Sequence, residues 1–248
     1  MYGDRQHLTS TKEGLVLMSQ LQSPQLIEAL QQYDSATVAN AIEHFEVRDP
    51  TMGYANNELV CQMPEVGAPM VGYALTVTAD TTTPGDTRTS RVDDLVEAID
   101  LAPKPSVLVV QHVGHDRKRC CLFGDMFCTI ASKLGCVGFV TDANGRDRSA
   151  IRQRTPDFHV FSTGWVVSHG YGVYIDFNVT VSVCGLTISP GDLLHGDESG
   201  LVSVPIDIAA DMVKRAEAVR EEEAEYFDFL ESDRFNMAEL KRRIIPHE

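Results

Sequence analysis

Two aspartates and one arginine, Asp125, Arg146 and Asp147, have the residue types needed for metal-assisted chemistry on a small acid. Two carboxylates that meet at one place can hold a hard divalent cation, and carboxylate and water ligands favour Mg²⁺ or Mn²⁺ over zinc. An arginine beside them adds a planar, permanently charged guanidinium group, which can bind a carboxylate or an enolate oxygen. The question is whether the fold brings these three side chains together.

The elements around these residues predict that it does. Val107–Val110 and Val137–Thr141 are short apolar runs typical of buried strands. Between them, residues 111–123 indicate a loop and Asp125–Leu134 has the periodicity of a helix, so the stretch predicts a βαβ unit. The turn signal at residues 142–145 follows the second strand.

In an open parallel sheet, ligands bind beyond the carboxyl ends of the strands, where Asp125 and Asp147 are both expected. The amides of Met126 and Phe127, in the first turn of the helix, would offer free N–H groups to an anion. Spacing alone leaves an ordinary alternative open. An aspartate at a helix start is often only a partner of the helix dipole, and Arg146-Asp147 after a turn is often a surface ion pair.

The rest of the chain predicts an α/β half followed by a β-rich half and a long helix from about Ile206 to Leu230. No linker or repeat interrupts residues 1–248, which favours one domain with a core at about 25–205 and a C-terminal helical segment at about 206–245. Three other helices are expected: one after Ser23-Pro24, one after Asp34-Ser35, and one at Asp93–Leu101. The other expected strands are Tyr73–Ala79, His159–Ser162, Val179–Val183, Leu193–His195 and Leu201–Val204.

Composition argues against several classes of partner. The 248 residues carry a formal net charge of −15, and their longest basic runs have three residues, so nucleic acid is not an expected partner. No apolar run is long enough to span a membrane, and Met1–His7 lacks the pattern of a secretory signal. Six cysteines without a disulfide framework predict reduced thiols and a cytoplasmic protein.

The stretch Phe123–Asp147 resembles the hallmark of a known family, which contains the 4-hydroxy-4-methyl-2-oxoglutarate (HMG/CHA) aldolases and the regulator of ribonuclease activity A (RraA-like) proteins. That hallmark is an acidic residue, twenty further residues, and then Arg-Asp, as in Asp125 and Arg146-Asp147. Val71–Val77, Ile188–Leu193 and His195–Val202 are similar to other family motifs in the same order, so the likeness covers roughly residues 25–235.

This resemblance implies a layered β/β/α swivelling-type domain that assembles as homotrimers or hexamers. It implies that Asp147 ligates Mg²⁺ directly, that Asp125 reaches the ion through water, and that Glu198 contributes from the neighbouring subunit. Gly124 and the amides of Met126 and Phe127 would bind the substrate carboxylate. Arg146 would stabilise the pyruvate enolate left by retro-aldol cleavage or decarboxylation of a small 2-oxo acid.

The loop before the helix that starts at Asp125 departs from the family pattern. In the family this loop is small and rich in glycine. Residues 111–121 instead contain His112, His115, Cys120 and Cys121. A zinc site is one interpretation, although adjacent cysteines rarely serve one tetrahedral ion. A polar loop that borders the pocket is the other interpretation.

Three functions remain open from the sequence. The first is a divalent-metal-dependent lyase, a class II pyruvate aldolase with oxaloacetate decarboxylase activity. The second is a non-enzymatic regulator that binds an RNA-processing endonuclease, and the third is a small-molecule binding module without turnover. The intact set of Asp125, Arg146 and Asp147 favours the enzyme.

Overall fold

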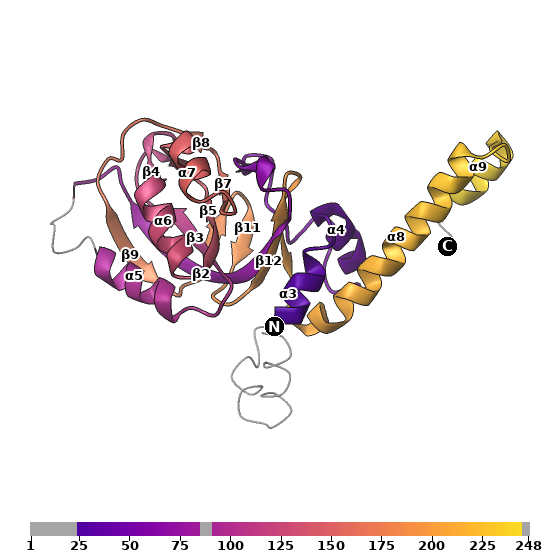
Figure 1. The fold of residues 1–248 in the computed structure, drawn as a ribbon, viewed down its shortest axis with the longest axis horizontal. Helices are drawn as coiled ribbons and strands as arrows, with labels where there is room; N and C mark the ends of the chain where they lie inside the picture. Colours follow the sequence, from indigo (N-terminus) through magenta and orange to yellow (C-terminus); the bar gives the residue numbers. More distant parts are fainter. Residues whose placement is uncertain (1–23, 85–90, 245–248) are drawn as a thin grey trace, which may run out of the picture.

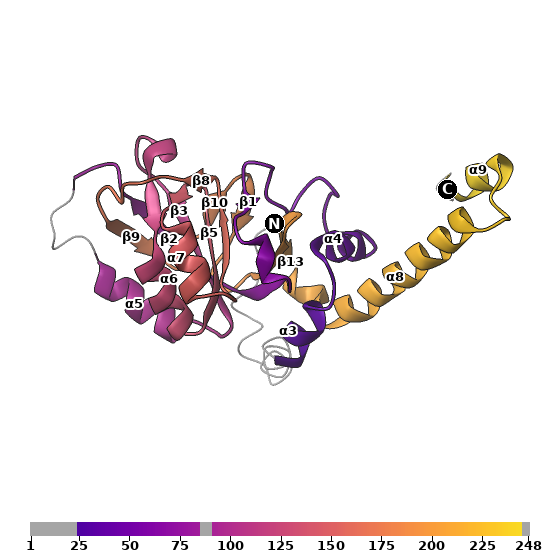
Figure 2. The same ribbon diagram turned by 45° about the horizontal axis from the view of Figure 1, so that its top comes forward.

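A layered β/β/α fold is seen in the computed structural model, which describes residues 24–84 and 91–244. Helices cover one face of a central sheet and a β-hairpin covers the other (Figures 1 and 2). The predicted fold class is therefore confirmed. The eight strands of the sheet are, in spatial order, β1 (Val60–Cys61), β7 (His159–Ser162), β5 (Cys136–Thr141), β3 (Ser106–His112), β2 (Met70–Asp80), β12 (Leu193–Asp197) and β13 (Gly200–Val204), with β9 (Val173–Phe177) also paired to β2.

The centre of the sheet is parallel, as the βαβ pattern predicts. Strand β2 pairs with β3, β3 with β5, and β5 with β7, all in parallel. Side chains of β2 alternate between the two faces, so Leu75 and Val77 pack under the helices while Ala74 packs under the hairpin. That hairpin consists of β10 (Val181–Val183) and β11 (Leu186–Ile188).

Three helices form the layer over the first face: α5 (Val92–Leu101), α6 (Asp125–Lys133) and α7 (Arg148–Arg154). Helix α6 buries Cys128 and Ala131, and the chain turns away at Gly135, whose φ of 80° suits a residue without a side chain. Helix α7 is short and mostly polar, with Ile151 as its buried residue. Its weak apolar pattern explains why the sequence did not predict it.

A second, three-stranded sheet corrects two of the sequence predictions. Strands β4 (Cys121–Phe123), β6 (Asn144–Gly145) and β8 (Gly164–Trp165) pair in parallel, where a loop and a turn were expected. Strands of two or three residues have too few positions to show a period, so only their partners define them. This small sheet leads directly into α6 and α7.

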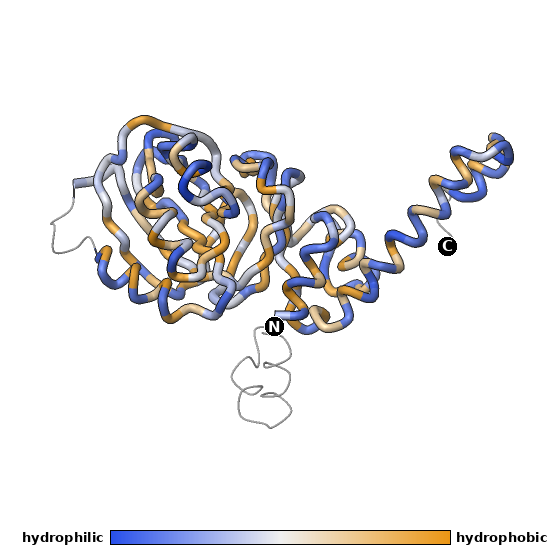
Figure 3. The backbone as a smooth tube through the Cα atoms, in the orientation of Figure 1, coloured by the Kyte–Doolittle hydropathy of each residue, from blue (hydrophilic) through white to orange (hydrophobic). Residues whose placement is uncertain are grey.

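The remaining helices gather at the other end of the molecule: α3 (Pro24–Leu30), α4 (Ser35–Glu43), α8 (Ala209–Glu231) and α9 (Met237–Ile244). Asp34 caps α4 by accepting a hydrogen bond from the amide of Thr37 at 2.8 Å. The first half of α8 packs on α3 and α4, and its second half projects away with a mainly hydrophilic surface (Figures 1 and 3).

No helix in residues 24–84 or 91–244 combines the length and the apolar character needed to cross a membrane. The expected cytoplasmic location stays a prediction, as does the assignment of residues 1–248 to one domain. Met1–His7 and Ser23 lie outside the described residues.

Candidate functional site

Helix α6 begins at Asp125, and Gly124 is its N-terminal capping residue. The backbone of Gly124 is extended, with φ −150° and ψ −173°. In the described part of the chain no group accepts a hydrogen bond from the amides of Met126 or Phe127, as expected for the first turn of a helix. Both residues line a cavity of about 180 Å³ at this helix end. The cavity therefore adjoins free N–H groups and the positive end of the helix dipole.

The small parallel sheet brings the second half of the site beside this helix start. Phe123, the last residue of β4, pairs with Gly145, the last residue of β6. The amide of Arg146 donates a hydrogen bond to the carbonyl of Phe123 at 3.1 Å. The two strands thus deliver Gly124 and Arg146 to the same rim. The sequence predicted a shared rim but assigned it to the wrong pair of strands.

Asp147 has a left-handed backbone, with φ 64° and ψ 33°. Aspartate tolerates this region better than most residues, and such conformations cluster at functional sites. Its carbonyl accepts hydrogen bonds from Ala150 and Ile151 and so starts α7. Its side chain turns back towards the rim, where Oδ2 lies 3.1 Å from Nε of Arg146.

Gly124 lies against the Arg146–Asp147 pair. A Cβ atom placed on Gly124 would lie 2.9 Å from Oδ2 of Asp147 and 3.3 Å from Nε of Arg146. The space that a side chain would fill is therefore bordered by the Arg146–Asp147 pair on one side. Asp125, the next residue along the chain, also lines the cavity.

Asp125 has an arginine partner of its own. Its Oδ2 lies 3.1 Å from Nε of Arg154 on α7. The side chain of Asp125 is 22% exposed and that of Arg154 is 63% exposed, so solvent screens the pair strongly. Each aspartate is therefore bonded through one oxygen to a guanidinium.

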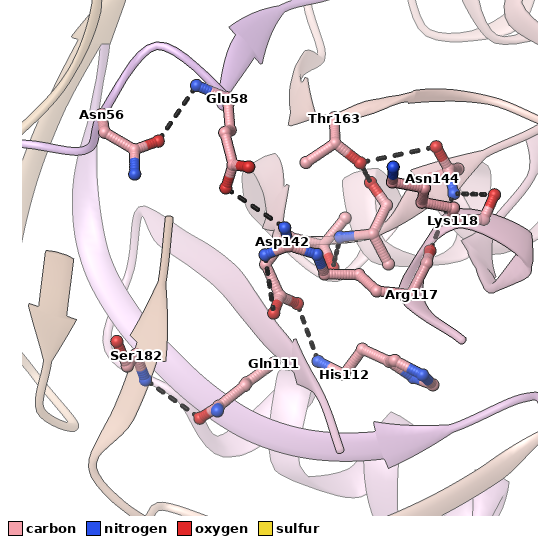
Figure 4. Close-up of polar contacts among 12 residues, drawn as sticks. Asn56, Glu58, Gln111, His112, Arg117, Lys118, Asp142, Asn144, Thr163 and Ser182 are labelled. Carbon is pink, nitrogen blue, oxygen red and sulfur yellow. Dashed lines mark hydrogen bonds and ion pairs between the residues drawn. The ribbon is translucent and has the colours of Figure 1, made fainter. Parts of the chain in front are cut away.

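Buried polar residues behind the rim hold the two strands in place (Figure 4). Nδ2 of Asn144 donates to the carbonyls of Arg117, Lys118 and Cys120, at 3.0 to 3.2 Å. Asn144 therefore links β6 to the segment that enters β4. The sequence analysis read Asn144 only as a turn residue. Its place two residues before Arg146 was the one signal that could have identified it.

Asp142 makes a second link at the end of β5. It accepts a hydrogen bond from the amide of His112 at 2.8 Å and lies 3.9 Å from a guanidinium nitrogen of Arg117 (Figure 4). Burial raises the pKa of Asp142, and the His112 amide and Arg117 act in the opposite direction. Arg117 also contacts Glu58 at 3.1 Å. This network holds the loop at residues 111–121, which contains the two histidines and two cysteines, in place.

The zinc interpretation of that loop finds no support in the geometry. Neither ring nitrogen of the buried His112 has a partner, and Sγ of Cys120 accepts a hydrogen bond from the hydroxyl of Thr81 at 2.9 Å. Within residues 24–84 and 91–244, no three His, Cys, Asp or Glu side chains are grouped to hold a metal ion. All six cysteines are free thiols, and Cys128 and Cys136 are buried in the core.

Glu198 does not join the other predicted site residues within one chain. It lies in the turn between β12 and β13 and borders a different cavity, of about 380 Å³, with Asp197 and His159. Its expected role in a neighbouring subunit stays a prediction. His195 is fully buried, and its Nδ1 lies 2.9 Å from the hydroxyl of Ser35.

The fold is that of a known class of proteins. The chain belongs to the RraA-like (Aldolase/RraA) family, whose model matches residues 35–203. A crystal structure of an uncharacterized protein from Pseudomonas syringae pv. tomato superposes with a TM-score of 0.68 at 25% identity, covering 90% of this chain and 95% of that one.

Two curated relatives are similar over part of their length. Protein DlpA of Legionella pneumophila is 26% identical over 199 residues, which make up 79% of this chain and 30% of DlpA. A Pseudomonas putida protein named "Putative 4-hydroxy-4-methyl-2-oxoglutarate aldolase" is 31% identical over 109 residues, 44% of this chain and 65% of that protein. The matched segments thus span less than two thirds of each of these relatives.

Proposed function

We propose that this protein is a divalent-metal-dependent lyase that cleaves a carbon–carbon bond in a small 2-oxo acid and releases pyruvate. The observation that carries the proposal is that the α6 start and Arg146 line one cavity, while Oδ2 of Asp147, which is not itself among the lining residues, lies against Arg146 and Gly124. The name of the Pseudomonas putida relative supports the same reaction class. The preferred substrates are of the 4-hydroxy-4-methyl-2-oxoglutarate type, with oxaloacetate decarboxylation as a related activity.

The residues at the rim fit Mg²⁺ or Mn²⁺. Mg²⁺ is usually bound by one or two carboxylates and keeps several waters, so the absence of a third acidic group from this rim in the described chain is compatible with it. Asp147 would hold the ion directly and Asp125 through water, and the space beside Gly124 adjoins Asp147. When bound, the cation would supply Lewis-acid stabilisation of the charge on the 2-oxo oxygen.

The protein's own groups supply binding, orientation and charge stabilisation. The amides of Met126 and Phe127 would bind the substrate carboxylate at the helix start. Cleavage breaks the bond between C3 and C4, the 4-hydroxyl loses its proton as C4 becomes a carbonyl, and the electron pair remains on the pyruvate fragment as an enolate. Arg146 would stabilise that developing charge. Asp125 is proposed to accept the hydroxyl proton through a water molecule.

Two further features of the proposal concern assembly. We propose that the protein forms a homotrimer or hexamer and that Glu198 of one subunit completes the site of the next. The position of Glu198 in a separate cavity of the same chain is compatible with that role. Light scattering of the purified protein measures the assembly, and a Glu198→Gln variant that assembles normally but loses activity would support the shared site.

The test of the proposed function is pyruvate release. The protein is mixed with Mg²⁺ or Mn²⁺ and a panel of 4-hydroxy-2-oxo acids and oxaloacetate, and pyruvate is measured with and without a chelator. Chelator-sensitive pyruvate formation is the expected result. If no substrate of the panel gives pyruvate, the lyase proposal is wrong and the regulatory, protein-binding function becomes the better one.

A further inference from the structure

A histidine reaches the proposed active-site cavity from a second part of the chain. Residues 166–172 connect β8 to β9, and His169 and Gly172 of this loop line the cavity together with Arg146 and the start of α6. The proposed metal site and bond cleavage do not use His169. Its contacts therefore have to show what an imidazole does at this place.

The loop is attached to the rest of the site through Thr81, which follows β2. The Thr81 carbonyl accepts a hydrogen bond from the amide of Tyr171 at 2.8 Å. Gly170 packs against the same carbonyl: its φ is 59°, and a Cβ atom there would lie 2.2 Å from the oxygen. The Thr81 hydroxyl donates to Sγ of Cys120 at 2.9 Å and accepts from the amide of Cys121 at 3.1 Å. The loop is thus tied to β4, the strand that leads into α6.

The ring of His169 has a defined orientation. Its Nδ1 lies 2.7 Å from the carbonyl oxygen of Gly170, which can only accept a hydrogen bond, so Nδ1 carries a hydrogen atom. Among the described residues none bonds to Nε2, which donates when the ring is protonated. Of the described residues that line the cavity, Arg146 and His169 are the two whose side chains can be cationic. Because Arg146 is bonded to Asp147, His169 is the better partner for a second anionic group.

We propose that Nε2 of His169 binds the distal carboxylate of dicarboxylic 2-oxo acids, and that His169 thereby selects these substrates over monocarboxylates. The inference rests on the proposed lyase function and assigns its substrate preference to one residue. 4-Hydroxy-4-methyl-2-oxoglutarate and oxaloacetate both carry such a second carboxylate.

The physical reason is a donor for each end of the substrate. With the first carboxylate at the amides of Met126 and Phe127, a protonated His169 gives the second carboxylate a charge-assisted hydrogen bond. The carboxylate in turn favours the charged form of the ring, in which Nδ1 still donates to the Gly170 carbonyl. A methyl group in place of the distal carboxylate forgoes this bond.

A matched pair of substrates tests the inference on the full-length protein in its native assembly. 4-Hydroxy-2-oxoglutarate and 4-hydroxy-2-oxopentanoate differ only in having a carboxylate or a methyl as C5. Both release pyruvate when the C3–C4 bond breaks, with glyoxylate or acetaldehyde as the second product. With saturating Mg²⁺, the wild type should prefer the glutarate in kcat/KM by about tenfold or more.

Histidine variants assign that preference. His169→Gln should lower kcat/KM for the glutarate by about tenfold or more and leave the value for the pentanoate within about twofold. His169→Lys keeps a cation at this position and should lose less than the glutamine variant. His115 is exposed and is not among the described residues that line the cavity, so His115→Gln is the matched control and should leave both values within about twofold.

Binding without turnover provides a readout that a merely structural role would not give. 2-Oxoglutarate and 2-oxopentanoate lack the 4-hydroxyl and cannot undergo the retro-aldol step. By calorimetry with Mg²⁺ present, His169→Gln should weaken 2-oxoglutarate by about tenfold and leave 2-oxopentanoate within about twofold. Equal weakening of both ligands would overturn the inference.

The attachment of the loop can be tested separately. Gly170→Ala should displace His169, because its Cβ would lie 2.2 Å from the Thr81 carbonyl. We expect the same selective loss for the glutarate as in His169→Gln, by about tenfold. Wild-type selectivity in Gly170→Ala would contradict the placement of His169 by this contact.

The outcomes separate this inference from the proposal on which it rests. Pyruvate from both substrates, with no glutarate preference in the wild type or with equal losses in His169→Gln, would overturn the inference and leave the lyase function standing. Pyruvate from neither would overturn the lyase function, while the calorimetry would still decide whether His169 binds the distal carboxylate.

Discussion

Nε of Arg146 lies 3.1 Å from Oδ2 of Asp147, although the two residues are consecutive in the chain. The left-handed backbone of Asp147 makes this contact possible, because it turns the side chain back towards β6 as α7 begins. The same turn places Oδ2 of Asp147 against Gly124. The proposed metal ligand is thus oriented both by its own backbone and by its neighbour.

Asp147→Asn should remove metal binding with little change in folding. Asparagine tolerates the left-handed region, so the variant removes charge without adding backbone strain. We expect Mn²⁺ affinity by calorimetry to fall at least about tenfold, and pyruvate release with it. Asp147→Ala should add roughly 1–2 kcal/mol of instability from the φ of 64°. The exposed Asp228→Asn is the matched control, and unchanged metal affinity in Asp147→Asn would contradict the assignment.

Asp125→Asn should separate metal binding from turnover. If Asp125 accepts a proton through water, the variant keeps most of its metal affinity but loses about 10²-fold or more in kcat. Arg154→Gln is the control, because it removes the guanidinium bonded to Asp125 while keeping the carboxylate. Since the Arg154 side chain is 63% exposed, loss of the pair should cost about 1 kcal/mol of stability or less. Wild-type turnover by Asp125→Asn would exclude the proton-transfer role.

Gly124→Ala should damage the site without unfolding the chain. A φ of −150° suits alanine, but its Cβ would lie 2.9 Å from Oδ2 of Asp147. We expect kcat/KM to fall about tenfold or more, because small displacements of reacting groups are costly. Gly172→Ala is the matched glycine control, because Gly172 lines the same cavity but a Cβ there meets nothing within 4 Å. Equal effects of the two substitutions on kcat/KM would argue against the crowding of Asp147 as the cause.

The stability of the protein should depend on the titration of His159. Burial lowers the pKa of His159 from 6.5 to about 4, so the unfolded chain binds this proton more readily than the folded one. Above pH 6.5 His159 is neutral in both states and takes nothing from the stability. As the pH falls from 6.5 towards 4, the free energy of unfolding decreases by roughly 3 kcal/mol. Urea unfolding at pH 7, 6 and 5 measures it.

The His159→Gln variant isolates this contribution from that of other groups that titrate in the same range. The difference in unfolding free energy between wild type and variant should shrink as the pH falls from 7 to 5. A difference that stays constant over this range would show that His159 does not cause the pH dependence.

The sequence by itself determined the main elements of the fold. The helices at Asp34-Ser35 and Asp125–Leu134 and the buried strands around Val107–Val110 and Val137–Thr141 were predicted from local signals, and the structure confirms them. These elements bury apolar residues at regular spacing, and Gly135 ends its helix through its own backbone freedom. The family resemblance supplied the layer order, which the parallel register of β2, β3 and β5 matches.

Only the tertiary structure decided how the site is assembled. Strands β4 and β6 are too short to show a periodic pattern in the sequence. Asn144 links β6 to the segment before β4 through hydrogen bonds to backbone carbonyls, which no sequence pattern predicts. Tyr174, which also lines the cavity, comes from β9, which is distant in sequence from α6 but pairs with β2. Contacts between short segments far apart in the chain depend on the packing of the whole domain, so local propensity cannot predict them.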